Sequence, residues 1–288
     1  MPVTYPYLMT KVLVATDVHM PSPYLATILE GIKLVKPDAL IISGDLSVNG
    51  KLGDLEKLFV KLRKVDQKMR VITVLGNHDL WIHEKDSDSI SKIERINKLS
   101  EKYNVELLDA IDRTELGDYD VVGNVGWYDY SFAPCYTDFD YENCNPYKCS
   151  KGYIRRNCVY LSTMNECSCP NWHNDCIYTK LESRSFAKVN KEKVERNIRG
   201  RQTIIVTHHA PLKDLIKEHS FFNAYDGQDL SDIIFNPNNK ILYYIYGHLH
   251  GNSVTPKMTI NGITFMNAYS FQFKVRDYVQ NAILNLQT

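Results

Sequence analysis

Five apolar runs, each followed directly by a polar residue, constrain the fold of this 288-residue chain more than any other feature. The runs are rich in β-branched and aromatic residues, which is typical of strands buried on both faces of a sheet. They occupy residues 11–17, 39–45, 70–77, 203–208 and 241–248. Because ligand sites in open α/β sheets lie beyond the carboxyl ends of the strands, the polar residues that end these runs are expected to converge in space.

Amphipathic segments separate the first three runs and predict helices. Their apolar residues recur at helical spacing over residues 24–35, 53–65 and 87–103. The chain therefore opens with a β-α-β-α-β pattern. Later regions, 106–127 and 203–273, are richer in short strand-like runs and in turn sequences such as Asn261-Gly262. These regions predict a second sheet.

The polar residues at the ends of the runs have the chemistry of metal ligands. They are Asp17, His19, Asp45, Asn77, His208, His248 and His250. Carboxylate and amide oxygens combined with imidazole nitrogens suit Mn, Fe, Zn or Co better than Ca or Mg. Two divalent transition metals held roughly 3.5–4 Å apart need a bridging carboxylate, and Asp45 is the best candidate for that bridge.

The order and spacing of these motifs resemble those of the calcineurin-like metallophosphoesterases. The motifs are Asp17-Val18-His19, Gly44-Asp45, Gly76-Asn77-His78-Asp79, Thr207-His208-His209 and Gly247-His248-Leu249-His250. The resemblance covers roughly residues 11–127 and 182–273. It implies an α/β fold of two packed mixed β-sheets flanked by helices, a four-layer α/β/β/α sandwich.

The resemblance also implies a role for each motif residue. One metal is then held by Asp17, His19, Asp45 and His250, and the second by Asp45, Asn77, His208 and His248. In that family a hydroxide that bridges the two metals attacks phosphorus. A histidine in the position of His78 stabilises the transition state or protonates the leaving oxygen, and Asp79 is expected to orient it.

Two adjacent histidines compete for one ligand position. His208 directly ends its apolar run, and neighbouring side chains in a strand point to opposite faces. We therefore favour His208 as the ligand and expect His209 beside the metal centre or in contact with phosphate. Asn223 and Tyr225, between the last two motifs, are candidates for substrate contacts, although capping and packing are simpler roles for them.

The sequence at the end of the second run limits the class of phosphoesterase that the chain resembles. Residues 44–50 read Gly-Asp-Leu-Ser-Val-Asn-Gly, without the arginine of the GDxVDRG signature of protein serine/threonine phosphatases. We therefore expect a phosphodiesterase or phosphomonoesterase that acts on a nucleotide or another small molecule. A nuclease is disfavoured without a basic groove. The alternative is a non-hydrolytic binding or scaffold protein on the same fold, with a cysteine-rich insertion at residues 131–180 as its interaction module, but the filled ligand positions favour the enzyme.

All seven cysteines lie in one segment, residues 131–180, that has little periodic apolar pattern. They are Cys135, Cys144, Cys149, Cys158, Cys167, Cys169 and Cys176. The segment is interpreted as an insertion within a single metallophosphoesterase domain, residues 1–288. Disulfides, a structural zinc site that includes or omits His173, and an iron–sulfur cluster all remain open. The aromatic residues Phe132, Tyr136 and Trp172 within this segment, with Tyr130 just before it, form either a stacking surface for a base or, as we favour, a small core.

Global charge and hydropathy limit the partners of the chain. Lysine plus arginine and aspartate plus glutamate both total 34, so nothing indicates a polyanion-binding protein. No apolar stretch approaches the roughly 18 residues that a membrane span needs, and residues 1–10 do not resemble a signal peptide. A cytoplasmic protein is expected. Residues 180–201 carry eight basic residues against three glutamates on a predicted helix, for which a solvated face is a simpler role than substrate attraction.

Overall fold

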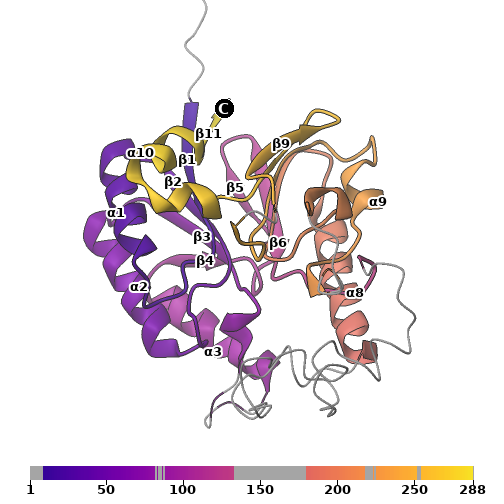
Figure 1. Ribbon diagram of the computed structural model, residues 1–288, viewed down its shortest axis with the longest axis horizontal. Helices are drawn as coiled ribbons and strands as arrows, with labels where there is room; N and C mark the ends of the chain where they lie inside the picture. Colours follow the sequence, from indigo (N-terminus) through magenta and orange to yellow (C-terminus); the bar gives the residue numbers. More distant parts are fainter. Residues whose placement is uncertain are drawn as a thin grey trace, which may run out of the picture.

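The computed structural model describes residues 9–81, 83, 86, 88–132, 180–217, 223, 225–251 and 254–287. In these residues eleven strands form two mixed sheets. The sheets pack against each other, and helices cover the outer side of each (Figure 1). The predicted two-sheet sandwich is thus confirmed. The seven cysteines, Tyr136, Trp172 and His173 lie outside the described residues, so their roles and the single-domain organisation stay predictions.

The first sheet has the strand order β11-β1-β2-β3-β4. Its strands are β1 (Met9–Ala15), β2 (Ala39–Ser43), β3 (Arg70–Val74), β4 (Val105–Leu107) and β11 (Ile283–Gln287). The first four are parallel, and β11 pairs antiparallel with β1. Every residue of β2 is buried, as expected for a central strand that is covered on both faces.

Four helices accompany this sheet on its outer side (Figure 1). They are α1 (Tyr24–Val35), α2 (Leu52–Val65), α3 (Ser89–Lys102) and α10 (Val275–Asn281). Each of the first three coincides with a predicted amphipathic segment, and α1 buries Leu25, Ile28 and Ile32 at helical spacing. A capping box between Asp88 and Ser91 begins α3.

The second sheet has the order β5-β6-β7-β8-β10-β9. Its strands are β5 (Thr114–Leu116), β6 (Tyr119–Asn124), β7 (Gln202–Thr207), β8 (Ile241–Ile245), β9 (Lys257–Ile260) and β10 (Ile263–Met266). The helices α8 (Lys180–Asn197) and α9 (Ser231–Ile234) lie on its outer side (Figure 1). Asn261 and Gly262 both have positive φ between β9 and β10, which confirms the predicted hairpin turn.

Alternation along β7 divides the apolar core. Ile204 and Val206 belong to the core between the two sheets, whereas Ile205 belongs to the core beneath α8 and α9. The strand therefore has one face toward the first sheet and one toward the helices.

Shorter 3-10 turns are η1 (His78–Leu80), η2 (Lys213–Leu215) and η5 (Tyr269–Phe273). Within the described residues, none of the helices is long and apolar enough to cross a lipid bilayer.

Candidate metal centre

The loops that leave β1 and β2 stay paired beyond the ends of their strands. The amide of Asp17 donates to the carbonyl of Gly44 at 3.0 Å, and that of His19 donates to the carbonyl of Asp45 at 2.8 Å. In the second sheet, the amide of Gly247 donates to the carbonyl of His208 at 2.9 Å. Backbone pairing therefore brings residues that are distant in sequence to one edge of the sandwich.

One half of the site lies around Asp17. The Nε2 atom of His250 is 2.8 Å from Asp17 Oδ1, and the Nε2 atom of His19 is 3.5 Å from Asp45 Oδ2 and 3.9 Å from Asp17 Oδ1. Both carboxylates are buried. These four residues are those of the first predicted ligand set.

The other half lies around Asn77. Its side-chain oxygen is 3.1 Å from His208 Nε2 and 3.2 Å from His248 Nδ1. His208 Nε2 is also 3.4 Å from Asp45 Oδ1. Asp45 thus presents Oδ2 to one half of the site and Oδ1 to the other, as a bridging ligand must.

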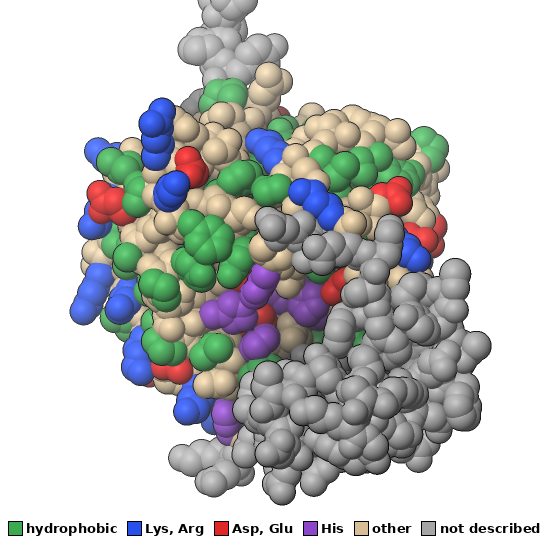
Figure 2. Space-filling view, in the orientation of Figure 1, with side chains coloured by type: hydrophobic (Ala, Val, Ile, Leu, Met, Phe, Trp, Pro, Cys, Tyr) green, Lys and Arg blue, Asp and Glu red, His purple; other side chains and the backbone are tan. Residues whose placement is uncertain are grey.

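The histidines of the site gather in a hollow on one face of the protein (Figure 2). Carboxylate and imidazole atoms lie within 4.8 Å of one another in three overlapping groups, which contain Asp17, His19, Asp45, His78, His208 and His250. Buried carboxylates beside neutral imidazoles are costly without a cation. This donor set fits divalent transition metals.

The backbone at the site is strained. Asp17, His19, Asp45 and His248 have φ values of 48°, 50°, 50° and 66°, in the left-handed region that L-residues seldom adopt. Such conformations persist where surrounding contacts fix them, and they cluster at functional sites. The left-handed backbone conformation at the strand ends directs these side chains toward one another.

Two glycines permit the close approach of the loops. A Cβ atom on Gly76 would lie 2.0 Å from Asp45 Oδ1, and one on Gly247 would lie 2.1 Å from Thr16 Oγ1. Both distances are shorter than any real Cβ contact. The glycines that precede Asn77 and His248 are therefore required by packing.

His208 and His209 point in different directions, as strand alternation predicts. His208 continues the face of Val206 toward the first sheet, where its Nδ1 atom contacts the carbonyl of Ser43 at 2.9 Å. His209 contacts the carbonyl of Val125 at 3.2 Å through Nδ1. Its Nε2 atom is buried without a hydrogen-bond partner among the described residues. This geometry supports His208 as the ligand.

His78 is held by backbone on the side away from the site. Its Nδ1 atom lies 2.8 Å from the carbonyl oxygen of Val48, and its Nε2 atom lies 3.8 Å from Asp45 Oδ2. The ring of Trp81 lies against it, with ring centroids 3.9 Å apart. Nε2 is therefore the ring nitrogen that faces the clustered ligands.

The hydrogen bonds of Asp79, the residue expected to orient His78, go to backbone amides. The carboxylate of Asp79 accepts hydrogen bonds from the amides of Leu46 at 3.0 Å, Ser47 at 2.9 Å and Gly76 at 2.9 Å. Asp79 therefore joins the loop after β2 to the loop after β3. The carbonyl of Val48 orients the histidine ring in its place.

Burial keeps most of the histidines neutral. It lowers the pKa of His78 to about 3 and that of His209 to about 4. Burial and then neighbouring histidines lower the pKa values of His208 and His248. Burial also disfavours the charged form of His250, but its hydrogen bond to Asp17 and the charge of that carboxylate outweigh this effect and raise its pKa. Neutral imidazole is the form that binds metals.

The structure adds supporting residues that the sequence analysis did not identify. Thr16 Oγ1 donates to Asp17 Oδ2 at 2.6 Å. The side chain of Gln272 pairs with both backbone groups of Thr16 at 2.8 Å, and that of Asn267 donates to the carbonyls of Gly247 and Leu249. Asp109 accepts from the amides of Leu75 and Val125, one beyond each sheet. These polar residues are isolated in or near loops, so no periodic sequence pattern could have predicted their roles.

The residues predicted to contact substrate are engaged in packing. The side-chain amide of Asn223 donates to Asp226 at 2.7 Å. Tyr225 makes edge contacts with Tyr128 and Tyr130, at ring-centroid distances of 5.2 and 5.5 Å. Phe132 is buried in the core beneath α8 and α9, so this ring is not a stacking surface. These contacts favour the simpler structural roles.

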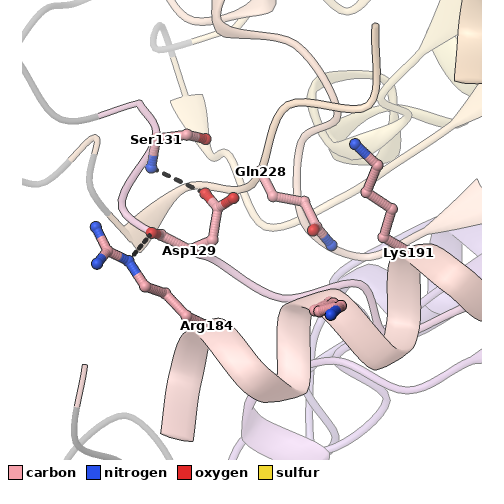
Figure 3. Close-up of a pocket in the computed structure, with 6 residues that line it drawn as sticks. Asp129, Ser131, Arg184, Lys191 and Gln228 are labelled. Atoms are coloured by element: carbon pink, nitrogen blue, oxygen red, sulfur yellow. Dashed lines mark hydrogen bonds between the residues drawn. The ribbon is translucent and has the colours of Figure 1, made fainter. Parts of the chain in front are cut away.

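A cavity of about 400 Å³ lies beside α8, away from the predicted ligands (Figure 3). It is lined by Asp129, Ser131, Arg184, Lys188, Lys191 and Gln228. Its basic residues already have partners: Lys191 lies 2.8 Å from Asp232, and the Nε atom of Arg184 donates to the carbonyl of Asp129. These pairings favour a structural role for the basic residues of α8 over a role in binding an anion.

The fold and the clustered side chains define a class of protein: an α/β sandwich with a group of candidate metal ligands where its two sheets meet. A family model described as calcineurin-like phosphoesterase matches residues 10–252. The chain therefore belongs to the calcineurin-like phosphoesterase family. This membership indicates metal-dependent phosphoester hydrolysis in general.

Solved structures share this fold at low sequence identity. One is 13% identical, with a TM-score of 0.55, and the alignment covers 97% of this chain and 99% of the other. A second, the protein TT1561 of Thermus thermophilus, is 10% identical, with a TM-score of 0.51 and the same coverage. A search of curated proteins finds no match. At these identities the structural likeness shows the fold alone.

Proposed function

We propose that this protein is a binuclear metallophosphoesterase that acts as a phosphodiesterase or phosphomonoesterase on a small-molecule or nucleotide substrate. The position of Asp45 is the observation that carries this proposal. Its two carboxylate oxygens face two separate groups of ligands, at 3.5 Å from His19 and 3.4 Å from His208. A site for a single metal has no need of this arrangement.

The residues divide into two ligand sets that share one carboxylate. Asp17, His19, Asp45 and His250 would hold one metal, and Asp45, Asn77, His208 and His248 the other. Two such divalent metals, as Mn, Fe, Zn or Co, supply a water of lowered pKa and stabilise the charge on phosphoryl oxygens. Backbone pairing of the loops and the hydrogen bond from Thr16 to Asp17 would hold these side chains in place.

His78 is the residue that we assign to proton transfer. Its Nδ1 atom is engaged by the Val48 carbonyl, so Nε2 is directed toward the site. Because the proton of the neutral ring lies on Nδ1, Nε2 would have to take up a second proton before it could protonate the leaving oxygen, and the negative charge of the phosphoryl group would favour that imidazolium form. His209 is a further candidate for contact with a phosphoryl oxygen, but its buried Nε2 atom would need a proton for that role, because Nδ1 faces the carbonyl of Val125.

Elemental analysis by mass spectrometry tests the proposal. We expect about two transition-metal ions per chain in the purified parent, and loss of both in Asp45→Asn because the shared ligand is weakened. Loaded parent protein should hydrolyse a phosphodiester or a phosphomonoester in a substrate screen, and the variant should not. Asp54→Asn on α2 is the matched control, since its carboxylate pairs with Lys57 far from these ligands.

The outcomes separate the enzyme from the scaffold alternative. Parent protein that binds no metal under loading conditions contradicts the proposal and supports a non-hydrolytic role. Metal that survives in Asp45→Asn at the parental amount places it elsewhere, with the cysteine segment as the next candidate. One metal retained in the variant would contradict the bridging role alone.

A further inference from the structure

An aromatic cluster adjoins the candidate metal centre on the side of α1. The ring of Tyr269 stacks on that of His250, with centroids 4.2 Å apart and planes 4° from parallel. Tyr24 and Phe273 meet Tyr269 edge-on at 5.8 and 5.3 Å, and each other at 5.0 Å. We refer to Tyr24, Tyr269 and Phe273 as the aromatic rim.

The aromatic rim is open to solvent where it approaches the ligands. Phe273 is 51% exposed, and the side chain of His250 is 42% exposed. Tyr24 and Tyr269 are partly buried. In Figure 2 hydrophobic side chains border the histidine cluster directly. An exposed apolar surface of this kind, continuous with a candidate catalytic site, is typical of a ligand contact.

The opposite side of the histidine cluster has a different character. Trp127 and Tyr128 contact His209 with their rings but are buried, so they belong to the core. Of these two groups of aromatic residues around the histidines, the aromatic rim is the one with a freely exposed ring. A group attached to a phosphoryl group held at His250 would therefore reach Tyr269 first and the exposed ring of Phe273 next.

We propose that the aromatic rim binds a planar aromatic group of the phosphoester substrate, such as a nucleobase or an aryl ring. This inference rests on the proposed function, because it takes the phosphoryl group to lie at the clustered ligands. The three rings are mutually edge-on, a geometry that supports a further ring by stacking or edge contact. Stacking on such residues tolerates any base and adds affinity without hydrogen bonding.

Binding of two phosphonates, which do not require turnover, tests the inference. Benzylphosphonate and cyclohexylmethylphosphonate carry the same phosphoryl group and similar apolar volume, but only the first is planar and aromatic. Calorimetry on the full chain loaded with Mn should show benzylphosphonate binding roughly threefold to tenfold more tightly, the range expected for one aromatic pair.

Two phenylalanine substitutions make the test specific. Phe273→Leu keeps an apolar side chain and removes the most exposed of the three rings, so the ratio of the two affinities should fall toward one. Phe235→Leu is the matched control, since Phe235 is 37% exposed and follows α9 on the second sheet. It should leave the ratio at the parental value. Circular dichroism and metal content verify that both variants are folded and loaded.

Several outcomes overturn the inference. Equal affinities in the parent, binding of neither compound, or a Phe273→Leu variant that weakens both compounds equally would each do so. Hydrolysis of benzyl phosphate and of its methyl diester is measured separately and tests the proposed function. A preference for benzylphosphonate without turnover keeps the aromatic subsite and refutes the hydrolase, whereas turnover without preference does the reverse.

Discussion

The Nδ1 atom of His208 lies 2.9 Å from the carbonyl oxygen of Ser43, so the Nε2 atom of the same ring faces Asn77 and Asp45. A strand of the first sheet thereby selects the tautomer of a candidate ligand on the second. Carbonyl partners of this kind commonly fix the orientation of metal-binding histidines. His209, one residue later, is oriented by the carbonyl of Val125 in the same way.

The adjacent histidines should therefore differ in their effect on metal content. We expect His208→Ala to lose one of about two metals per chain, since it belongs to one ligand set. His209→Ala should retain both metals and lower phosphoesterase activity. Mass spectrometric metal analysis of the two variants distinguishes them, and the reverse pattern would assign the ligand to His209.

His78→Ala should separate metal binding from turnover. Its ring faces the ligands without being in either ligand set, so metal content should stay at the parental level while kcat falls about 10²- to 10⁴-fold. The loss should be greater for alkyl esters, whose leaving oxygen needs a proton, than for p-nitrophenyl esters. Loss of metal, or an equal loss for both kinds of ester, would contradict the assigned role.

The close contact at Gly76 yields a matched pair of glycine substitutions. In Gly76→Ala the new methyl group would collide with the backbone and carboxylate of Asp45, so we expect a loss of about 2–4 kcal/mol in the free energy of unfolding and loss of metal. Gly53→Ala on α2 places its methyl group in open space and should stabilise by about 0.4–1 kcal/mol. Urea denaturation measures both, and equal effects would refute the packing explanation.

Asp109 should make stability depend on pH. Burial raises its pKa from 3.8 to about 6, so between these values the folded protein keeps a proton that the unfolded chain has released. The free energy of unfolding should consequently fall as pH rises from about 4 to about 6. Asp109→Asn should be less stable below this window and show a shallower fall across it. Denaturant titrations at several pH values measure both slopes, and identical slopes would exclude this contribution.

Most of the central strands and the helices between them could be predicted, because apolar runs and helical spacing are local features of the sequence. The buried runs gave β1, β2, β3, β7 and β8 within a few residues, and α1 has the predicted bounds. The polar residues after these strands converge because parallel strands end at one edge of a sheet. The sequence contains no comparable continuous apolar run for β11, whose residues alternate between apolar and polar and which pairs with β1 from the far end of the chain.

The contacts between loops could not be predicted from the sequence. Asp79 follows His78 directly, which suggested a partnership, yet its carboxylate is used by the backbone amides of Leu46, Ser47 and Gly76. Gln272 pairs with the backbone of Thr16 across 256 residues of chain. Such long-range polar pairs have no periodicity, so only the folded arrangement identifies them.

The hydrogen bond between Asp17 and His250 has a consequence for the folding of the chain. It joins residues 233 positions apart, one beyond each sheet. Metal held by the same two side chains would act as a reversible cross-link between the halves of the sandwich, and its binding energy would be released only when both halves have formed. The melting temperature would then follow the concentration of free metal, with about 2.7 kcal/mol of added stability at a hundred times the dissociation constant. A cell that limits this metal would thus limit the lifetime of the folded protein as well as its activity.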